Sequence, residues 1–281
     1  MNWPEQGIHH GVPFSIYRED DITPADTRET VIGKAVSKSM LTKFAEDPGT
    51  WKRSIRKETT AAMRTGSLVD CLLLEPDKFE TRYALSPYAD FRKKEAQEWR
   101  SEMAKGGVEV ITEDQMATAQ DMVDACKNHY DAGALLYGAK TQLAFRHATK
   151  HGFDAKGLID AVPLAEDTLV DLKTCRASAL ENKRSLQREI FEWGYHIQAG
   201  AYLDGFNIAG GEERTRFKFV FVSSAPPHTV AVIELPLAAI LLGAEQYRAA
   251  MQRFADCLMD DVWPSQWDGT VELDLPEYAY T

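Results

Sequence analysis

The sequence contains few cysteines and no long apolar run. Its four cysteines lie far apart and none forms a C-x-x-C pair, which argues against zinc and iron–sulfur sites. No stretch approaches the roughly 18 consecutive apolar residues of a membrane-spanning helix. Residues 1–17 also lack the apolar core of a secretory signal. We therefore expect a cytoplasmic protein with reduced thiols and no membrane contact.

The motifs of several common enzyme classes are absent as well. There is no P-loop, no G-x-G-x-x-G dinucleotide motif and no G-x-S-x-G nucleophile elbow. His147 and His151 are four residues apart, as in zinc-protease helices, but the Glu that such helices carry next to the first His is missing. These absences argue against nucleotide-dependent, serine-hydrolase and zinc-protease chemistry.

Positive charge is in short supply. The chain has 32 Lys and Arg against 43 Asp and Glu, and its net charge is −11. Because a uniformly acidic surface repels duplex DNA, this composition argues against general coating of nucleic acid. The charge is uneven, however, since residues 34–64 are rich in Lys and Arg. A basic groove within an acidic body remains compatible with the composition.

The apolar periodicity changes from helical to strand-like in the middle of the chain. It predicts helices over 37–46, 58–74, 77–83, 112–133, 179–206 and 236–259, and strands over 142–147, 157–163, 168–174, 217–223 and 229–234. Residues 85–108 are highly charged and are expected to form a surface helix with loops. Three tryptophans are expected in the core or in interfaces: Trp51, Trp99 and Trp193.

This order of elements predicts an α/β (α+β) fold, with a central mixed sheet flanked by helices and an N-terminal helical elaboration. We expect a partly ordered N-terminal arm over residues 1–35, one catalytic domain over 36–265 and a C-terminal tail over 266–281.

The most informative segment pairs Gly-Leu-Ile-Asp, ending at Asp160, with Val-Asp-Leu-Lys-Thr, which contains Asp171 and Lys173. On a strand, Asp171 and Lys173 point to the same face because they are two residues apart. A tight antiparallel hairpin centred between Ala165 and Glu166 would place Asp160 directly opposite Asp171, with Cβ atoms about 4.5–5.5 Å apart. Two carboxylates and one ammonium would then share one face of the sheet.

Carboxylates this close repel each other unless a cation or a proton neutralises them. Oxygen ligands of this kind suit Mg²⁺ or Mn²⁺, and a lysine beside them suits phosphodiester hydrolysis. The alternative is a solvated strand edge or a cross-strand ion pair, which is the common role of Asp and Lys at this spacing. The apolar neighbours of Asp160 and Asp171 favour the site, because isolated charges seldom persist in core-like strands.

These segments resemble the D…(D/E)-x-K signature of the PD-(D/E)XK nucleases, including a trailing Thr. Residues 195–202, Tyr-His-Ile-Gln-Ala-Gly-Ala-Tyr, resemble the Q-x-x-x-Y motif of the RecB-like and RecE-like branches. Residues 65–79 and the Ser37-Lys38-Ser39-Met40-Leu41 segment resemble two upstream segments of RecE-type (exonuclease VIII-like) exonucleases. The matches occur in the order of that family, from about residue 35 to residue 260.

The resemblance implies a restriction-endonuclease-like PD-(D/E)XK core and assigns roles to individual residues. It implies that the metal ligands are Asp70, Asp160, Asp171 and the carbonyl of Leu172. Lys173 would act on the attacking water or the transition state, and Gln198 and Tyr202 would support the phosphate. Without the resemblance, Gln198 and Tyr202 could equally be a capping amide and a packed tyrosine.

Asp70 departs from the family, which has a metal-binding His at this position. A carboxylate is a harder ligand that also suits Mg²⁺, so the site could be retained, or the change could mark drift towards inactivity. Ser37, Lys38 and Ser39 are candidates for binding a DNA phosphate at a helix start, where backbone N–H groups favour anions. The alternative is a capping serine with solvated lysines.

The resemblance therefore implies a Mg²⁺-dependent double-strand DNA exonuclease, with Mn²⁺ as a substitute, acting in the cytoplasm of a bacterial host and encoded by a phage or prophage. It would degrade 5′→3′ from double-stranded DNA ends and leave 3′ overhangs for a single-strand annealing protein. A ring-shaped homo-oligomer, a trimer or a tetramer, would hold the DNA. The alternatives are a RecB-like nuclease acting on single strands or flaps, against which the scattered cysteines count, and an inactive DNA-end-binding module.

Overall fold

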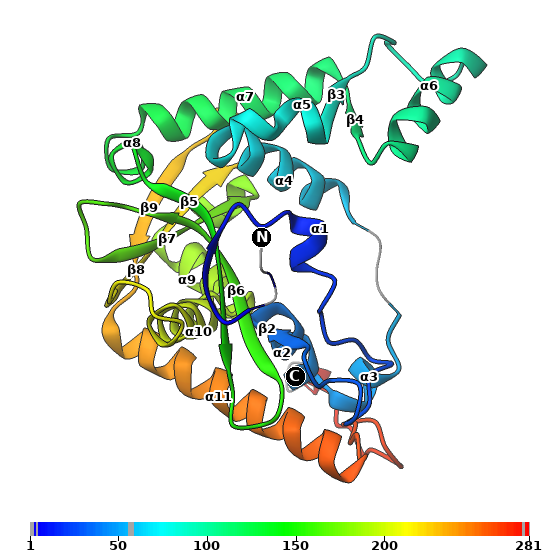
Figure 1. Cartoon of the computed structure of the whole chain (residues 1–281), viewed down its shortest axis with the longest axis vertical. Coiled ribbons are helices and arrows are strands. Elements are labelled where there is room, and N and C mark those ends of the chain that lie inside the picture. Colours follow the sequence, from blue (N-terminus) through cyan, green and yellow to red (C-terminus); the bar gives the residue numbers. More distant parts are fainter. Residues whose placement is uncertain (1–2, 4, 56–58, 277–278, 281) are drawn as a thin grey trace.

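A central mixed sheet organises the chain, as shown in Figure 1 by a computed structural model that describes residues 3, 5–55, 59–276 and 279–280. Its strands follow the order β1-β5-β6-β7-β8-β9, and β2 pairs with β6 beside this path. The strands are β1 (Gly7–His10), β2 (Ala35–Ser37), β5 (Lys140–Ala148), β6 (Asp154–Val162), β7 (Thr168–Cys175), β8 (Arg216–Ser223) and β9 (Val230–Glu234). The pairs β2–β6 and β7–β8 are parallel and the other pairs are antiparallel. The predicted mixed α/β fold is confirmed.

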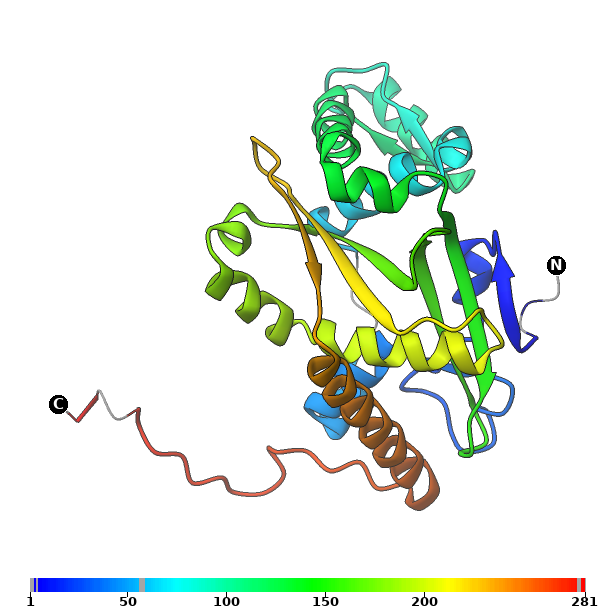
Figure 2. The same ribbon diagram turned by 90° about the vertical axis from the view of Figure 1, so that its left-hand side faces the viewer.

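Helices cover both faces of this sheet (Figure 2). On one face lie α4 (Ala61–Leu74), α7 (Glu113–Asn128) and α8 (Tyr130–Leu136), and on the other lie α10 (Tyr195–Ile208) and α11 (Leu237–Asp260). Strand β8 shows why both faces need a cover. Its phenylalanines at 217, 219 and 221 pack towards α10, whereas Val220 and Val222 pack towards α4 and α7. A strand that is apolar on both sides is stable only between two layers.

Helices α10 and α11 cross at two glycines, which allow their backbones to touch. A Cβ added to Gly200 would lie 2.3 Å from the backbone nitrogen of Ala244, and one added to Gly243 would lie 1.9 Å from the carbonyl oxygen of His196. Any side chain at either position would force the helices apart. This crossing holds α10, with Gln198 on it, at a fixed height over the sheet.

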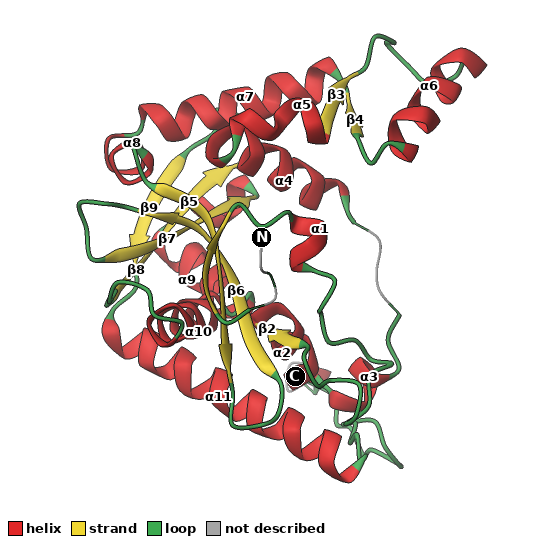
Figure 3. Cartoon of the chain, viewed as in Figure 1, coloured by secondary structure: helices red, strands yellow, loops and turns green. Residues whose placement is uncertain are grey.

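The remaining elements are short, and Figure 3 shows them by type. They are α1 (Phe14–Tyr17), α2 (Lys38–Glu46), α3 (Pro48–Lys52), the 3₁₀ turns η1 (Pro76–Lys78) and η2 (Ala177–Leu180), α5 (Phe79–Arg82), β3 (Tyr83–Leu85), α6 (Lys94–Lys105), β4 (Glu109–Ile111) and α9 (Lys183–Glu192). Strands β3 and β4 form a separate parallel pair, and α6 stands away from the body beyond them (Figure 1). Within the described residues, no helix combines the length and the apolar character needed to cross a bilayer.

Several predicted helices differ from the structure in their limits. The helix expected over 112–133 is divided at His129 into α7 and α8. The helix expected over 179–206 is two helices, α9 and α10, separated at Trp193 and Gly194, where Gly194 adopts φ 59°. The left-handed backbone of Gly194 turns the chain between them. The helix expected from residue 58 begins at Ala61, after the capping Thr60, and residue 58 itself lies outside the described residues.

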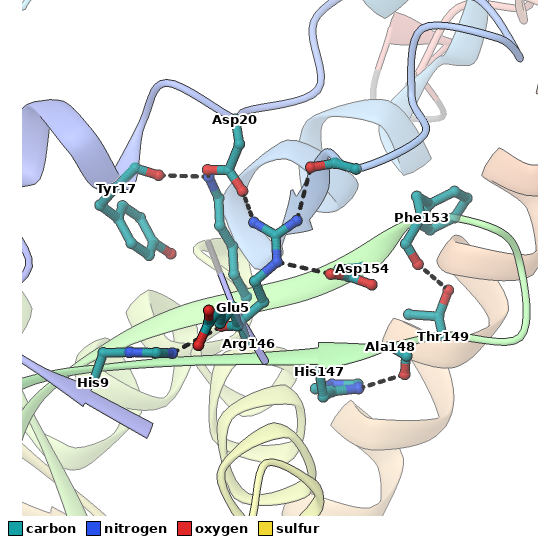
Figure 4. A network of polar contacts seen from close by, with 12 residues as sticks. Glu5, His9, Tyr17, Asp20, Arg146, His147, Ala148, Thr149, Phe153 and Asp154 are labelled. Atoms are coloured by element: carbon teal, nitrogen blue, oxygen red, sulfur yellow. Dashed lines mark hydrogen bonds and ion pairs between the residues drawn. The ribbon is translucent and has the colours of Figure 1, made fainter. Parts of the chain in front are cut away.

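The N-terminal residues differ from the expected partly ordered arm. Strand β1 pairs with β5, and Tyr17 and Val12 are buried against the sheet. Asp20 forms ion pairs with Arg146 and Lys156, two cations from β5 and β6 that are each only 1% exposed. Figure 4 shows Arg146 between Asp20 and Asp154. Because buried cations need a partner, this network fastens the N-terminal segment to the sheet.

The C-terminal segment is attached at its beginning and then leaves the body, as the red trace in Figure 2 shows. Ser265 and Gln266 both donate hydrogen bonds to Asp47, whose carboxylate also caps α3. The hydrogen bonds from the backbone nitrogen of Thr50, the hydroxyl of Ser265 and the backbone nitrogen of Gln266 lower the pKa of Asp47 to about 2. Beyond them, Leu273 and Leu275 are exposed.

Candidate active site

Strands β6 and β7 meet in the register predicted from the sequence. Ala161 is aligned with Val170, and the same register places Asp160 opposite Asp171. Asp160 Oδ2 accepts a hydrogen bond from the backbone nitrogen of Leu172 at 2.8 Å. A side chain thus replaces a backbone contact between the strands, and the Asp160 carboxylate is held against β7.

Asp171 is the centre of the cluster and is only 3% exposed. Its Oδ2 lies 2.5 Å from the Nζ of Lys173, and its Oδ1 accepts a hydrogen bond from the Nε2 of Gln198 at 2.5 Å. Asp171 Oδ2 accepts no hydrogen bond of regular geometry, although it is buried. One face of β7 and the start of α10 therefore bring together the predicted catalytic residues Asp171, Lys173 and Gln198.

The third carboxylate, Asp70, comes from α4 on the face that meets β6 and β7. Gly66, one turn earlier, allows this approach, because a Cβ there would lie 3.1 Å from Thr174 Oγ1. Burial and then the charge of Asp171 raise the pKa of Asp70 to about 7. The negative charge of Asp171 on β7 therefore acts on Asp70. In the family that the sequence resembles, this position is a histidine.

The carboxylates act on one another as the sequence predicts. Burial raises the pKa of Asp160 well above its usual range, and the charges of Asp171 and Asp70 raise it further. Burial alone would lower the pKa of Lys173, but the charges of Asp171 and Asp160 outweigh it and the pKa is raised. Lys173 is therefore a stable cation, and one ammonium faces three carboxylates. Such a cluster favours a further cation.

The donor atoms are not arranged as a closed metal site. In the described part of the chain, no group of three or more His, Cys, Asp or Glu side chains has the arrangement of metal ligands. Two of the carboxylates are instead held by protein donors, Asp160 by Leu172 and Asp171 by Gln198. The residue types and the excess of negative charge nevertheless fit Mg²⁺.

Tyr202 lies on α10, about one helical turn after Gln198. Its ring packs edge-on against Phe145 at 5.6 Å, and burial followed by the charge of Asp171 raises its pKa. The structure thus places Tyr202 next to the carboxylates and within the core, where it supports α10 against the sheet.

The three N-terminal candidates for phosphate binding have different surroundings. Ser37 caps α2 by accepting a hydrogen bond from Met40, and Ser39 is exposed. Lys38 is only 8% exposed and donates to the carbonyl oxygen of Trp193 at 3.0 Å. Burial and the nearby charge of Lys173 lower the pKa of Lys38 to about 8. Lys38 therefore faces the catalytic cluster and not open solvent, and part of the basic segment, residues 56–58, lies outside the described residues.

Two residues of the site had no signal in the sequence. Gln142 on β5 has φ 51° and donates from Nε2 to Asp160 Oδ1 at 3.2 Å. A positive φ is costly for a residue with a side chain, and such strain is often kept at functional sites. Tyr195, at the start of α10, places its ring 4.9 Å from Lys173 Nζ. Each of these two residues contacts a member of the cluster that comes from another element, Asp160 for Gln142 and Lys173 for Tyr195.

Replacement of Gln142 by alanine is expected to weaken the candidate site without removing it. The loss of a hydrogen bond that orients a ligating carboxylate costs about 10–100-fold in metal affinity or activity. The measurement is the concentration of Mn²⁺ that gives half-maximal DNA cleavage by Gln142→Ala. Gln120→Ala, on the outer side of α7, is the control and should leave that concentration unchanged. Equal metal dependence of the two variants would contradict the role of Gln142.

A family model described as a PDDEXK-like domain of unknown function (DUF3799) matches residues 33–273. The chain belongs to this family. The PDDEXK-like match includes every candidate site residue, from Ser37 to Tyr202, whereas β1 and the partly buried Asp20 lie before it. No curated protein is similar enough to the chain to match it.

A solved structure supports this PDDEXK-like fold. A protein from Eubacterium rectale that carries the provisional name exonuclease superposes with a TM-score of 0.59 at 14% identity, covering 87% of this chain and 92% of that one. A phage related exonuclease from Haemophilus somnus 129PT has a TM-score of 0.39 at 12% identity, with coverage of 83% and 98%. The first likeness supports the fold, and the second is too low to support an argument.

Proposed function

We propose that this protein is a metal-dependent DNA nuclease whose catalytic centre is the cluster of Asp70, Asp160, Asp171 and Lys173. The observation that carries the proposal is the position of Asp171, which lies in an ion pair with Lys173 and raises the pKa of both other carboxylates. Asp70, Asp160, Asp171 and the carbonyl of Leu172 would hold Mg²⁺, or Mn²⁺ in its place. When bound, the metal would neutralise these carboxylates and polarise a phosphoryl oxygen.

The chain's own residues have separate tasks in phosphodiester hydrolysis. Lys173 remains protonated because of Asp171 and Asp160, so it would stabilise negative charge that develops on the phosphoryl group. Gln198 fixes the orientation of Asp171 through Oδ1 and leaves Oδ2 directed at Lys173. Tyr202 packs beneath and holds α10 in place. The ammonium and the carboxylates are positioned before substrate binds, which lowers the cost of reaching the transition state.

The substrate we propose is the end of double-stranded DNA, degraded 5′→3′ to leave a 3′ overhang for a single-strand annealing protein. This RecE-type assignment is supported by the ordered motifs from Ser37 to Tyr202. The name of the fold neighbour from Eubacterium rectale, an exonuclease, is consistent with it. A ring-shaped trimer or tetramer, in the cytoplasm of a bacterial host that carries the phage or prophage, completes the proposal.

The test is digestion of a linear duplex, labelled at the 5′ end of one strand, beside a closed circular duplex. We expect loss of the linear substrate only, with Mg²⁺ or Mn²⁺, and no loss with Asp171→Ala or Lys173→Ala. Cleavage of single strands or flaps alone would favour a RecB-like nuclease. An intact linear duplex with both metals, for wild type and variants alike, would contradict the enzyme and leave a DNA-end-binding module.

A further inference from the structure

Helix α9 carries a basic stripe on its solvent side. Leu186 and Glu189 form its buried side, and Glu189 pairs with Arg176. The opposite side exposes Arg184, Arg188 and Phe191, which follow one another at helical spacing. Lys183 adds a third exposed cation, and Glu192 is an exposed carboxylate beside Phe191.

Two large aromatic side chains end this stripe. Phe191 is 70% exposed, and one face of its ring stacks on His196 at 5.7 Å. Trp193 is 60% exposed, so of the two places expected for it, the core or an interface, it does not lie in the core, and no aromatic ring of the described residues stacks on it. Exposure of a tryptophan leaves a large apolar face in water, which is costly unless a partner covers it.

Trp193 is connected to the catalytic cluster by short steps. Its carbonyl oxygen accepts the hydrogen bond from Lys38 Nζ. Lys38 Nζ lies 6.0 Å from the centre of the Tyr195 ring, and Lys173 Nζ lies 4.9 Å from that same centre. The backbone of Trp193 thus lies next to the site, two residues before Tyr195, and its exposed indole belongs to a residue that contacts Lys38.

We propose that the exposed face of α9 and the indole of Trp193 bind the unpaired nucleotides next to the phosphate in the site. Arg184 and Arg188 contact the backbone phosphates, and Trp193 stacks on a base. Single-strand binding sites combine cations that follow the backbone with aromatic rings that stack on bases. Every base of an unpaired strand can offer a face to the indole, whereas a duplex offers only the outer face of its terminal base pair, so the ligand is a single strand. This inference rests on the proposed nuclease function and adds the path of the strand.

The test uses the full chain with Asp171→Ala, so that DNA binds without being degraded. Fluorescently labelled oligothymidylate is titrated at several salt concentrations, with the anisotropy of the label giving the affinity and tryptophan emission reporting the stacking. Trp193→Ala should weaken binding about tenfold, since stacking is worth about 1–3 kcal/mol per base and 1.4 kcal/mol is tenfold. Trp193→Phe should keep most of the affinity and lose the quenching. Removal of Arg184 and Arg188 should reduce the slope of log affinity against log salt by about 1.4.

Matched controls lie elsewhere on the surface. Trp267→Ala removes a tryptophan that is 62% exposed on the C-terminal segment. The double change of Arg92 and Lys94 to alanine removes two cations whose side chains are each 88% exposed. Both should leave oligothymidylate binding unchanged. Equal binding by the α9 variants and the controls would overturn the inference, as would a change in Trp193 fluorescence with protein concentration alone, which would indicate self-association.

The two proposals fail in different ways. If the wild type cleaves linear duplex and the α9 variants do so equally well at all substrate concentrations, the strand path is wrong and the nuclease stands. If no cleavage occurs but oligothymidylate still quenches Trp193, the nuclease fails and the single-strand surface stands. Trp193→Phe guards against misfolding as an explanation, because it preserves an aromatic ring at the exposed position.

Discussion

Replacement of Asp171 by asparagine is expected to reduce DNA cleavage by about 10³-fold or more, because metal-assisted charge stabilisation supplies several kcal/mol and each 1.4 kcal/mol is a factor of ten. Asp171 is the carboxylate that both Lys173 and Gln198 contact. Asparagine has nearly the same shape and can still accept a hydrogen bond from Gln198, but it has neither the charge that pairs with Lys173 nor the second carboxylate oxygen. The measurement is the rate of loss of a labelled linear duplex in saturating Mn²⁺.

The control for this change is Asp167→Asn on the turn between β6 and β7. Asp167 contacts Thr215 and lies outside the cluster, so this variant should keep the wild-type rate. Both proteins should show the same far-ultraviolet circular dichroism, since neither change affects the packing of the sheet. Retention of more than about a tenth of the activity by Asp171→Asn would show that the catalytic carboxylate lies elsewhere.

The carboxylate pair could be predicted because its geometry is local. The turn between the two segments and the alternation of apolar residues set one register, and the pairing of Ala161 with Val170 agrees with it. A short antiparallel hairpin leaves little freedom, so two carboxylates eleven residues apart are placed face to face. The same reasoning places Lys173 beside Asp171, since side chains two residues apart on a strand share a face.

The parts that could not be predicted depend on contacts between distant segments. Asp20 neutralises Lys156, which is 136 residues away, so nothing near either residue indicates that residues 1–35 belong to the sheet. Gln142 contacts Asp160 from a left-handed backbone, a conformation that its residue type does not favour and that the sequence therefore does not indicate.

Lys38 and Trp193 show a different limit. Both residue types occur in surfaces and in cores, and composition alone does not separate these roles. Lys38, expected either to bind a DNA phosphate or to be solvated, is buried, and Trp193, expected in the core or in an interface, is exposed. One hydrogen bond, from Lys38 Nζ to the carbonyl oxygen of Trp193, fixes both positions across 155 residues of sequence. The turn at Gly194, which replaces the single predicted helix with two, creates that contact.

Asp70→Asn is expected to stabilise the metal-free protein at neutral and alkaline pH and to change little near pH 4. The pKa of Asp70 is raised to about 7 by burial and by Asp171, so the folded state holds a proton that the unfolded chain releases at lower pH. Wild-type stability therefore falls as pH rises from about 4 to about 7, whereas asparagine carries no charge at any pH. The gain in the free energy of unfolding should be about 1–3 kcal/mol at pH 8, because one pKa unit corresponds to about 1.4 kcal/mol.

The measurement is urea unfolding of wild type and Asp70→Asn in a chelator, at pH 4.5 and at pH 8. Asp77→Asn, an exposed carboxylate just beyond α4, is the control and should show the wild-type dependence on pH. Addition of Mn²⁺ at pH 8 should raise the unfolding midpoint of wild type more than that of Asp70→Asn, because a ligand that binds only the folded state stabilises it. If wild type and Asp70→Asn lose stability equally between pH 4.5 and pH 8, the pKa of Asp70 is not raised by burial and by the charge of Asp171. The metal would then have to be held by the strand carboxylates, Asp160 and Asp171, alone.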